Sequence, residues 1–475
     1  MTWREYHDTT KHTTESLRRN QHVLDWASMP DPFRHYEGVP VLDLPADPPA
    51  PGTAVAADGP MFLSQLLFHA AAVSATKTVP PTGYRYALRV NPSSGNLHPT
   101  EFHFATRGLT HWPDGLYHYR VSSHMAEQRA LGDFVTGLAG DATPIVFILT
   151  SIAWREAWKY RDRAYRYCLH DIGHAWQALA LSAQALGCET FAAGHFSDDE
   201  VARACGLSGD EWPMLIVKLH GPVAGSADNT RVWLGGTPNQ LSDLQIPYPL
   251  IETIHSATKF IAYRNSPRSE PAFSGSGEIE LPPPACSSRP FGEVARTRRS
   301  ALNFTGASQI SFADLSALLA STSQPYHADF AASRFVQLYL YVHRVDGLDP
   351  GVYRYWPEDA ALELIRSGDQ KVMAAGLSLG QSLAGNACVA FSMIADIDRA
   401  VRSQGDRGYR YVHFEAGAIG HRLYLASEAL GLRATGIGAF FDDEVNRYLE
   451  LSSAQGQVVY HFAAGHPVPD PRLDA

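Results

Sequence analysis

The stretch RDRAYRYCLHDIGHAWQALALSAQALG, which begins at Arg161, recurs as GDRGYRYVHFEAGAIGHRLYLASEALG, which begins at Gly405. The two copies are 244 positions apart, and the same spacing separates Leu207 from Leu451 further along the chain. Upstream, GLYHY corresponds to GVYRY and LSQLL to LSALL, in the same order. Because only two copies occur, and each is as long as a domain, the sequence predicts two domains of one fold rather than a solenoid of short repeats.

The composition is that of a globular protein with more than one core. The chain has 475 residues, so a typical domain size of about 150 residues suggests two or three units, and the repeat selects two. Apolar residues make up 45% and charged residues 19%, a balance that allows a sizeable buried interior.

Charge and hydropathy exclude several classes of partner. The net charge is -10 and no basic stripe is interleaved with aromatic residues, which argues against nucleic acid. The polar N-terminal segment lacks the apolar stretch of a secretory signal, and no apolar run reaches the roughly 20 residues that cross a bilayer. The five cysteines form no CxxC pair and the histidines form no HExxH motif, so no metal is expected. These features predict a cytoplasmic protein that is not embedded in a membrane.

The domain boundaries follow from the repeat and from a stretch rich in Pro, Ser and Gly. We expect an N-terminal helical or extended segment at 1–45, a first domain at 46–250, a linker at 251–290 and a second domain at 291–475. Within the first half, the pattern predicts a helix at LSQLLFHAAAV, strands at EFHFAT and TPIVFILT, a long buried helix from about 163 to 186, a short helix opened by SDDEV and a strand at PMLIVKLHG. This order favours the α+β class, with helices around a sheet in each half.

The halves differ at two polar segments. The first half contains NPSSGNLHPTEF from Asn91, and the corresponding part of the second half has lost the Pro-Ser-Ser-Gly-Asn loop. The second half contains RTRRSALNF from Arg296, and the corresponding part of the first half has no cation. Because each half lacks what the other keeps, the sequence predicts one complete site between them.

These two segments offer different chemistry. In the first, Pro92 is a rigid apolar surface for a planar ring, followed by short hydrogen-bonding side chains: Ser93, Ser94 and Asn96. In the second, forked cationic donors stand beside a hydroxyl, which suits a phosphate: Arg298, Arg299 and Ser300. Taken alone, the first segment is more often an ordinary turn, and the second is more often the solvated basic end of a linker.

Two further segments are candidates. The turn GIGAFF lets backbone N–H groups approach a ligand closely, since two glycines remove side chains; its candidate residues are Gly436, Ile437, Gly438 and Ala439. It is not a GxGxxG motif, so a Rossmann site is not supported. Lys159 and Tyr160, just before the long helix, could supply a general base or acid. The alternative is an exposed lysine beside a packing tyrosine.

Together these segments resemble the nitroreductase superfamily, and in particular its SagB-type (thiazole/oxazole-forming) dehydrogenase branch. The resemblance rests on LDWASMPDPFRHYEG, NPSSGNLHPTEF, WKYRDRAYRY and GHAWQALALSAQALG in the first half, and on RRS, GDRGYRY and GIGAFFDDEV in the second. It implies two tandem nitroreductase-like domains, each a mixed sheet flanked by helices, that form an intramolecular pseudo-dimer. Members of the superfamily bind FMN at a dimer interface, so one FMN per chain is expected.

The resemblance also implies roles for the candidate residues. Arg298 and Ser300 would hold the phosphate and ribityl chain, the 436–439 turn would face the flavin N5 edge, and the 92–96 loop would close the site from the other half. Two departures leave the cations of the phosphate site open. Leu302 stands where the family usually has Lys or Arg, and no C-terminal basic pair is evident after Pro467.

The expected reaction is hydride transfer from a substrate C–H bond to flavin N5, with Lys159 or Tyr160 accepting the proton. Oxidation of an azoline to an azole in a modified peptide fits this best, and a small-molecule substrate is equally open. The alternatives are an NAD(P)H-dependent reductase of nitro, quinone or alkene substrates and a non-catalytic scaffold. The sequence leaves further self-association of the pseudo-dimer open.

Overall fold

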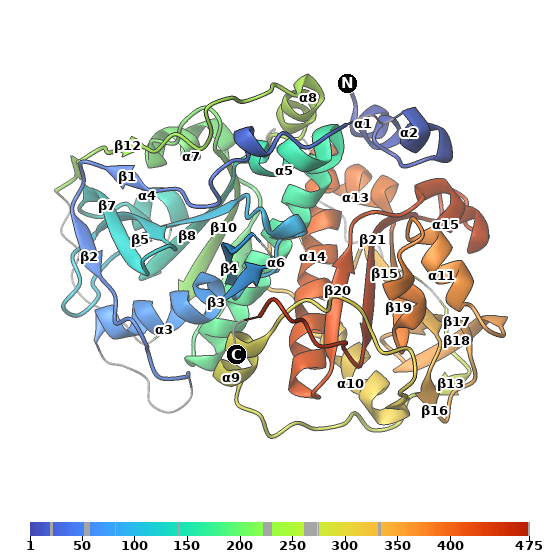
Figure 1. Cartoon of the computed structure of the whole chain (residues 1–475). Helices are drawn as coiled ribbons and strands as arrows, with labels where there is room; N and C mark the ends of the chain where they lie inside the picture. Colours follow the sequence, from blue (N-terminus) through green and yellow to red (C-terminus); the bar gives the residue numbers. More distant parts are fainter. Residues whose placement is uncertain are drawn as a thin grey trace.

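The structure is a computed structural model, and it describes residues 1–19, 22–51, 58–80, 82–140, 143–221, 230–260, 273, 275–330 and 334–473. Each half contains one large sheet with helices packed around it, and the two halves lie side by side (Figure 1). This arrangement confirms the predicted α+β class with helices around a sheet in each half. None of the described helices is long and apolar enough to cross a membrane.

The helices and strands of the first half, with the segments that flank it, are α1 Trp3–Thr9, α2 Thr14–Arg19, β1 Tyr36–Glu37, β2 Val41–Asp43, α3 Gly59–Ala71, β3 Val73–Val79, β4 Tyr84–Arg89, β5 Thr100–Thr106, β6 Gly115–Arg120, β7 Met125–Leu131, α4 Val135–Ala139, β8 Ile145–Ser151, α5 Ala153–Tyr160, α6 Ala164–Ala185, β9 Glu189–Ala193, α7 Asp198–Cys205, β10 Trp212–His220, β11 Val232–Trp233, β12 Thr237–Pro238 and α8 Pro249–Ala257.

Those of the second half are β13 Ile279–Glu280, α9 Phe291–Thr297, β14 Ile310–Ser311, α10 Phe312–Ser323, β15 Val336–Val342, β16 Val345–Asp346, β17 Gly351–Trp356, β18 Ala361–Ser367, α11 Lys371–Leu377, α12 Ser382–Asn386, β19 Val389–Ala395, α13 Ile397–Gln404, α14 Gly408–Ala429, β20 Arg433–Ile437, α15 Asp442–Tyr448 and β21 Gln457–Gly465.

The two large sheets have matching strand orders. The first runs β11-β7-β6-β5-β8-β10-β9, with β2 also paired to β7, and the second runs β13-β18-β17-β15-β19-β21-β20. The named strands within both sheets pair antiparallel. Parallel bridges add to the outermost strands, Ala192 with Ala328 on β9 and Ser300 with Ala434 on β20. The first bridge joins β9 of the first half to the segment before β15 of the second half. The second joins β20 to the segment that follows α9, within the second half.

The predicted elements of the first half are present, with small shifts at their ends. The helix expected at LSQLLFHAAAV is α3, which begins four residues earlier at Gly59 and ends at Ala71, because the β-branched Val73 opens a hairpin of β3 and β4. The sequence analysis did not predict this hairpin. The long helix expected over 163–186 is α6, and Gly187 follows its end with φ +73°.

The core of the molecule is the crossing of α6 and α14, which lie side by side between the two sheets (Figure 1). A Cβ on Gly173 would lie 2.2 Å from the carbonyl oxygen of Phe414, and one on Gly417 would lie 2.1 Å from that of His170. The helices therefore touch backbone to backbone, and only glycine fits at either position. These two glycines are 244 positions apart, so the repeat places the same residue on both sides of the contact.

Ion pairs connect the two halves around this crossing, and in each of them an aspartate of one half pairs with arginines of the other half. Asp442 of the second half accepts hydrogen bonds from two arginines at the start of the α6 region, and Asp198 of the first half does the same for two arginines at the start of the α14 region. The four arginines are Arg163 and Arg166 for Asp442, and Arg407 and Arg410 for Asp198. Both carboxylates are almost fully buried, so removing a partner would leave buried charge uncompensated.

Helices α1 and α8 occupy matching places in the two halves. Thr10, just after α1, accepts a hydrogen bond from Arg166 at 3.1 Å, and Thr258, just after α8, accepts one from Arg410 at 2.9 Å. Helix α1 lies in the N-terminal segment expected at 1–45. Helix α8, which the sequence analysis did not predict, crosses the expected boundary between the first domain and the linker.

Candidate functional site

A cavity of about 320 Å³ lies between the halves, and segments from both of them line it. All four segments singled out from the sequence reach it. The lining includes these predicted residues: Pro92, Ser93, Ser94, Asn96, Tyr160, Arg298, Arg299, Ser300, Gly436, Ile437, Gly438 and Ala439. The structure therefore brings the 92–96 loop and the RTRRS segment into one cleft, as the complementary losses of the two halves predicted.

Asp171 of α6 holds the 92–96 loop. Ser93 Oγ donates to Asp171 Oδ2 at 2.5 Å, while the Ser94 N–H and Oγ both donate to the same carboxyl group. Burial raises the pKa of Asp171 to about 7, although the hydrogen bonds from the two serines lower it. Two loop residues adopt left-handed backbone, Gly95 at φ +59° and Asn96 at φ +61°. The 92–96 segment is thus a loop whose conformation is fixed by hydrogen bonds to the buried Asp171 carboxyl group.

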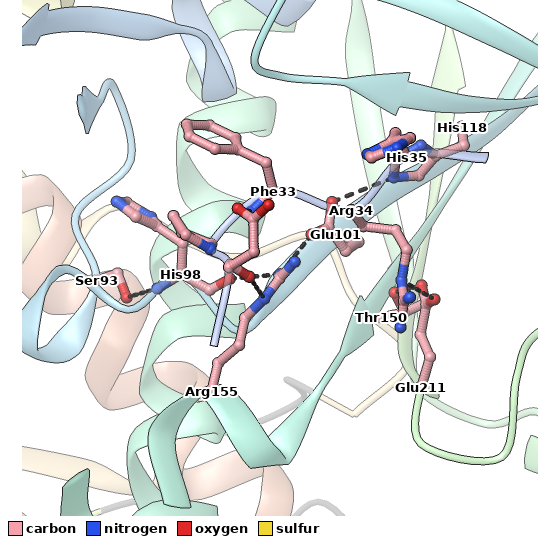
Figure 2. A network of polar contacts seen from close by, with 12 residues as sticks. Phe33, Arg34, His35, Ser93, His98, Glu101, His118, Thr150, Arg155 and Glu211 are labelled. Atoms are coloured by element: carbon pink, nitrogen blue, oxygen red, sulfur yellow. Dashed lines mark hydrogen bonds and ion pairs between the residues drawn. The ribbon is translucent and has the colours of Figure 1, made fainter. Parts of the chain in front are cut away.

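A buried polar network connects this loop to the first sheet (Figure 2). The His98 N–H donates to Ser93 Oγ at 2.8 Å, and the His98 carbonyl accepts from Arg155 Nη1 at 2.8 Å. Arg155 in turn pairs with Glu101 on β5, which contacts His118 at 3.2 Å. Because these groups are almost fully buried and mutually paired, they fix the position of the loop.

Lys159 and Tyr160 lie against the same loop at the end of α5. A Cβ on Gly95 would be 2.6 Å from the Tyr160 hydroxyl and 3.2 Å from Lys159 Nζ, so the missing side chain lets the loop approach both groups. Tyr160 also meets Tyr167 of α6 edge to face, with ring centroids 4.5 Å apart. The predicted pair is therefore at the loop, with Tyr160 on the cavity wall.

Arg298 spans the boundary between the halves. Its Nε donates to the Val90 carbonyl at 2.8 Å and its Nη2 to the Arg89 carbonyl at 3.1 Å, both just before the 92–96 loop. Its Nη1 is buried and has no hydrogen-bond partner among the described residues. Burial lowers the pKa of Arg298 to about 10. One donor of this guanidinium is therefore available to an anion in the cavity.

The other residues of this segment are already bonded. Arg299 donates to the Ser74 carbonyl at 2.9 Å and to Ser74 Oγ at 3.2 Å, and the Ser300 and Tyr424 hydroxyls are 2.9 Å apart. Leu302 is 47% exposed and is not part of the cavity lining.

Two cations that the sequence analysis missed line the same cavity. Arg89 is buried at the end of β4, and its Nε and Nη1 have no hydrogen-bond partner among the described residues. Lys77 of β3 forms an ion pair with Asp470 at 2.7 Å. Both belong to the unpredicted β3–β4 hairpin, which also pairs with the C-terminal segment at Leu473. The cavity therefore has two basic side chains that the sequence analysis did not assign to it.

The glycines of the 436–439 turn have a structural cause that the sequence did not reveal. A Cβ on Gly436 would lie 2.0 Å from the Tyr460 hydroxyl, and one on Gly438 would lie 2.2 Å from the Tyr167 ring. The Gly436 N–H donates to the Tyr424 hydroxyl at 2.9 Å. The two glycines therefore make room for tyrosines on the cavity wall.

Aromatic and polar residues of the two central helices, together with one residue of β21, also line the cavity. They are Tyr167, Asp171 and His174 of α6, Tyr424 of α14 and Tyr460 of β21. The three α6 residues are spaced by four and then three positions, so one face of that helix points into the cavity. The spacing of these three residues could have indicated the face toward the cavity. It was missed because α6 is buried on all sides around them, so no exposed face distinguishes them.

Comparison with known proteins identifies the family that this fold and two-sided cleft define. The Nitroreductase family profile matches residues 63–221 and 295–466, one segment in each half. The chain therefore belongs to the nitroreductase family of oxidoreductases.

Individual relatives agree with this assignment. The chain is 34% identical over 116 residues to the nitroreductase-like protein MJ1384 of Methanocaldococcus jannaschii, which is 24% of this chain and 59% of that protein. It is 32% identical over 123 residues to the trifolitoxin operon protein TfxC of Rhizobium leguminosarum bv. trifolii, which is 25% of this chain and 34% of that protein. The crystal structure of a nitroreductase-like protein of Anabaena variabilis superposes with a TM-score of 0.81 at 27% identity, covering 98% of this chain and 99% of that one.

Proposed function

We propose that this protein is an FMN-dependent dehydrogenase of the SagB type, which removes a hydride from a substrate C–H bond. The observation that carries the proposal is the single cleft, with unpaired guanidinium nitrogens on its wall and the Lys159–Tyr160 pair at the loop that closes it. The proposed substrate is an azoline in a modified peptide, oxidised to the azole in the cytoplasm; a small azoline compound would serve the same chemistry.

The donors of the cleft fit FMN. Arg298 Nη1, Arg89 Nε and Arg89 Nη1 are buried and have no hydrogen-bond partner within the described part of the chain, and a phosphate would supply acceptors for them. Burial also lowers the pKa values of Arg89 and Arg299 to about 10, which indicates that this positive charge is poorly compensated by the protein alone. Arg298, Arg89 and Lys77 would hold the phosphate, and Ser300 the ribityl chain. FMN, when bound, supplies the hydride acceptor.

Lys159 is the proposed proton acceptor. Burial raises the pKa of Tyr160 well above its usual value, and the nearby Glu156 raises it further, so the phenol keeps its proton at neutral pH. Tyr160 would therefore act as a hydrogen-bond donor to the substrate, and Lys159 would take the proton that leaves it. In the second half the corresponding positions of α13 are Ser403 and Gln404, so only one copy has this pair.

One FMN per chain is proposed because a second cleft is blocked. The repeat relates the cavity to an equivalent place in which the two halves exchange roles, and the protein's own side chains fill that place. There Asp329 accepts from the N–H groups of Gly194 and His195 at 2.8 and 3.1 Å, and the Phe330 ring stacks on Tyr411 at 4.2 Å. Tyr411 and Gly194 correspond in the repeat to Tyr167 and Gly438 of the described cavity. The protein's own chain thus fills the second position.

The test is the visible absorption spectrum of the purified protein and its FMN-to-chain ratio, followed by stopped-flow mixing with NADPH. We expect about one FMN per chain and no rapid bleaching by NADPH, with reduction by an azoline-containing peptide instead. Rapid reduction by NADPH would indicate the reductase alternative. A colourless protein that takes up no added FMN would overturn the cofactor assignment and favour a scaffold.

A further inference from the structure

Next to the 92–96 loop, the carboxyl groups of Glu156 and Asp171 lie within hydrogen-bonding reach of each other in the interior. Glu156 belongs to α5 and Asp171 to α6, and their exposed fractions are 0% and 1%. Glu156 precedes Lys159 by three positions and Tyr160 by four, so all three lie on one side of α5. The pair is thus close both to the loop, through the hydrogen bonds from Ser93 and Ser94 to Asp171, and to Lys159, which is one turn from Glu156 on α5.

The hydrogen bonds of the two groups are unequal. Asp171 accepts from Ser93 and Ser94, whereas neither oxygen of Glu156 has a hydrogen-bond donor among the described residues. An ionised Glu156 would be a buried charge without a donor, next to a second carboxylate. A proton on Glu156 supplies the missing donor, and Asp171 supplies its acceptor.

The surroundings favour a single proton on this pair. The titratable groups that interact with it are Lys159 and Tyr160 of α5, Cys168 of α6 and Tyr460 of β21. Lys159 is the basic group among them, and its positively charged form lowers the pKa of Glu156. Burial and the neighbouring Asp171 raise the pKa of Glu156 well above its usual value. Two carboxylates this close in a low dielectric cannot both ionise readily.

The second half of the chain is an internal comparison. Position 415 of α14 corresponds to Asp171 and carries Glu415, whose oxygens accept from the N–H groups of Phe335 and Val336 at 3.0 and 3.1 Å. Position 400 of α13 corresponds to Glu156 and carries Ala400. In both halves, a buried carboxyl group on the long helix accepts hydrogen bonds from a neighbouring segment. The one on α5 occurs only where Lys159 and Tyr160 also occur.

We propose that Glu156 and Asp171 share one proton and receive the proton that Lys159 takes from the substrate. This inference deepens the proposed dehydrogenase function and rests on it. In the step, the N–H bond of the Lys159 ammonium breaks, an O–H bond forms on the pair, and Lys159 returns to the neutral amine. The charge of the pair changes from -1 to zero, and no other reactant is required.

The first experiment is infrared spectroscopy of the protein at pH 6 to 9, with and without FMN. We expect the carbonyl stretch of a buried, protonated carboxylic acid at pH 7 in wild type and in Glu156→Asp, and its loss in Glu156→Gln. Glu415→Gln is the matched control on the corresponding helix. Burial raises the pKa of Glu415 to about 7, so this variant removes that group's own share of the band and should leave the Glu156-dependent share in place.

The second experiment is the pH dependence of flavin reduction by substrate in a single turnover. Wild type should slow as the pH falls below about 7, because a doubly protonated pair has no site for another proton. Glu156→Gln should retain about one FMN per chain, react about 10-fold or more slowly at pH 7 and lose this pH dependence. A purely structural role would lower the rate or the melting temperature without altering the pH profile.

Absence of the acid band in wild type, or a wild-type pH profile in Glu156→Gln, would overturn the shared-proton proposal. Failure of the proposed function gives a different result: a protein without FMN, or one reduced only by NADPH, in which the infrared band still reports on the pair.

Discussion

Replacing Arg298 by methionine separates phosphate recognition from the rest of cofactor binding. The change keeps most of the side-chain volume and removes the guanidinium, whose Nη1 is one of the buried donors at the cavity without a partner among the described residues. A hydrogen bond between charged groups contributes about 1.5–3 kcal/mol. The dissociation constant of FMN should therefore rise by about 10-fold to 150-fold.

The assay is a fluorescence titration of the apoprotein with FMN and, in parallel, with riboflavin, which lacks the phosphate. Riboflavin affinity should change little in Arg298→Met, so the two ligands should converge in affinity. Arg299→Met is the matched control, because Arg299 is the adjacent arginine and its donors are already bonded to Ser74 and to backbone carbonyls. It should weaken FMN binding less than Arg298→Met does.

The same substitution also removes two hydrogen bonds to the Arg89 and Val90 carbonyls of the other half. A loss of about 1–3 kcal/mol in the free energy of unfolding is expected from these buried groups. The melting temperature of the apoprotein reports this cost separately from ligand affinity. Equal weakening of FMN and riboflavin binding, or no weakening of either, would refute the assignment of Arg298 to the phosphate.

Three further changes test the site and the interface. Lys159→Met should leave FMN bound at about one per chain and slow its reduction by substrate by about 10²–10⁴-fold in anaerobic stopped flow; an unchanged rate would remove Lys159 from the proton step. Gly95→Ala introduces a Cβ at φ +59° and 2.6 Å from the Tyr160 hydroxyl, so a lower melting temperature and slower turnover are expected, and a wild-type-like variant would show that the loop tolerates displacement. Asp442→Asn should lower the free energy of unfolding by about 3–5 kcal/mol by denaturant titration, and Asp198→Asn should act alike because the ion pairs correspond; a cost below 1 kcal/mol would contradict the interlocking role. The pKa values of both aspartates are lowered by their arginines, so the stabilisation should be complete above about pH 4 and decrease as the pH falls further.

Much of the fold was predictable because the repeat is long and the buried helix is strongly patterned. The long helices, the main strands of the first half and the meeting of the 92–96 loop with the RTRRS segment all followed from the sequence. The β3–β4 hairpin did not, since KTVPPTGYRY has a turn signal but no clean alternation of apolar and polar residues. The hairpin brings Lys77 and Arg89, and so the sequence analysis missed half of the cations at the cavity.

The carboxyl pair was also beyond the reach of the sequence. Glu156 and Asp171 are 15 positions apart and belong to different helices, so only the packing of α5 on α6 brings them together. A glutamate in an amphipathic helix is usually solvated, and nothing in REAWKY marks this one as buried. The glycines at 436 and 438 differ from the carboxyl pair, because the motif was visible in the sequence. The reason for glycine at these positions was not. Tyr167 and Tyr460, which fill the vacated space, come from distant elements.

The interlocked crossing of α6 and α14 changes how the cleft responds to dilution. In a homodimer an interfacial cleft exists only while two chains are associated, so its occupancy falls with protein concentration. Here one covalent chain supplies both walls, which makes assembly of the cleft a unimolecular event. The dissociation constant for FMN should consequently be the same at nanomolar and micromolar protein. A substitution on one wall of the cleft also leaves the other wall unchanged, which is impossible in a homodimer.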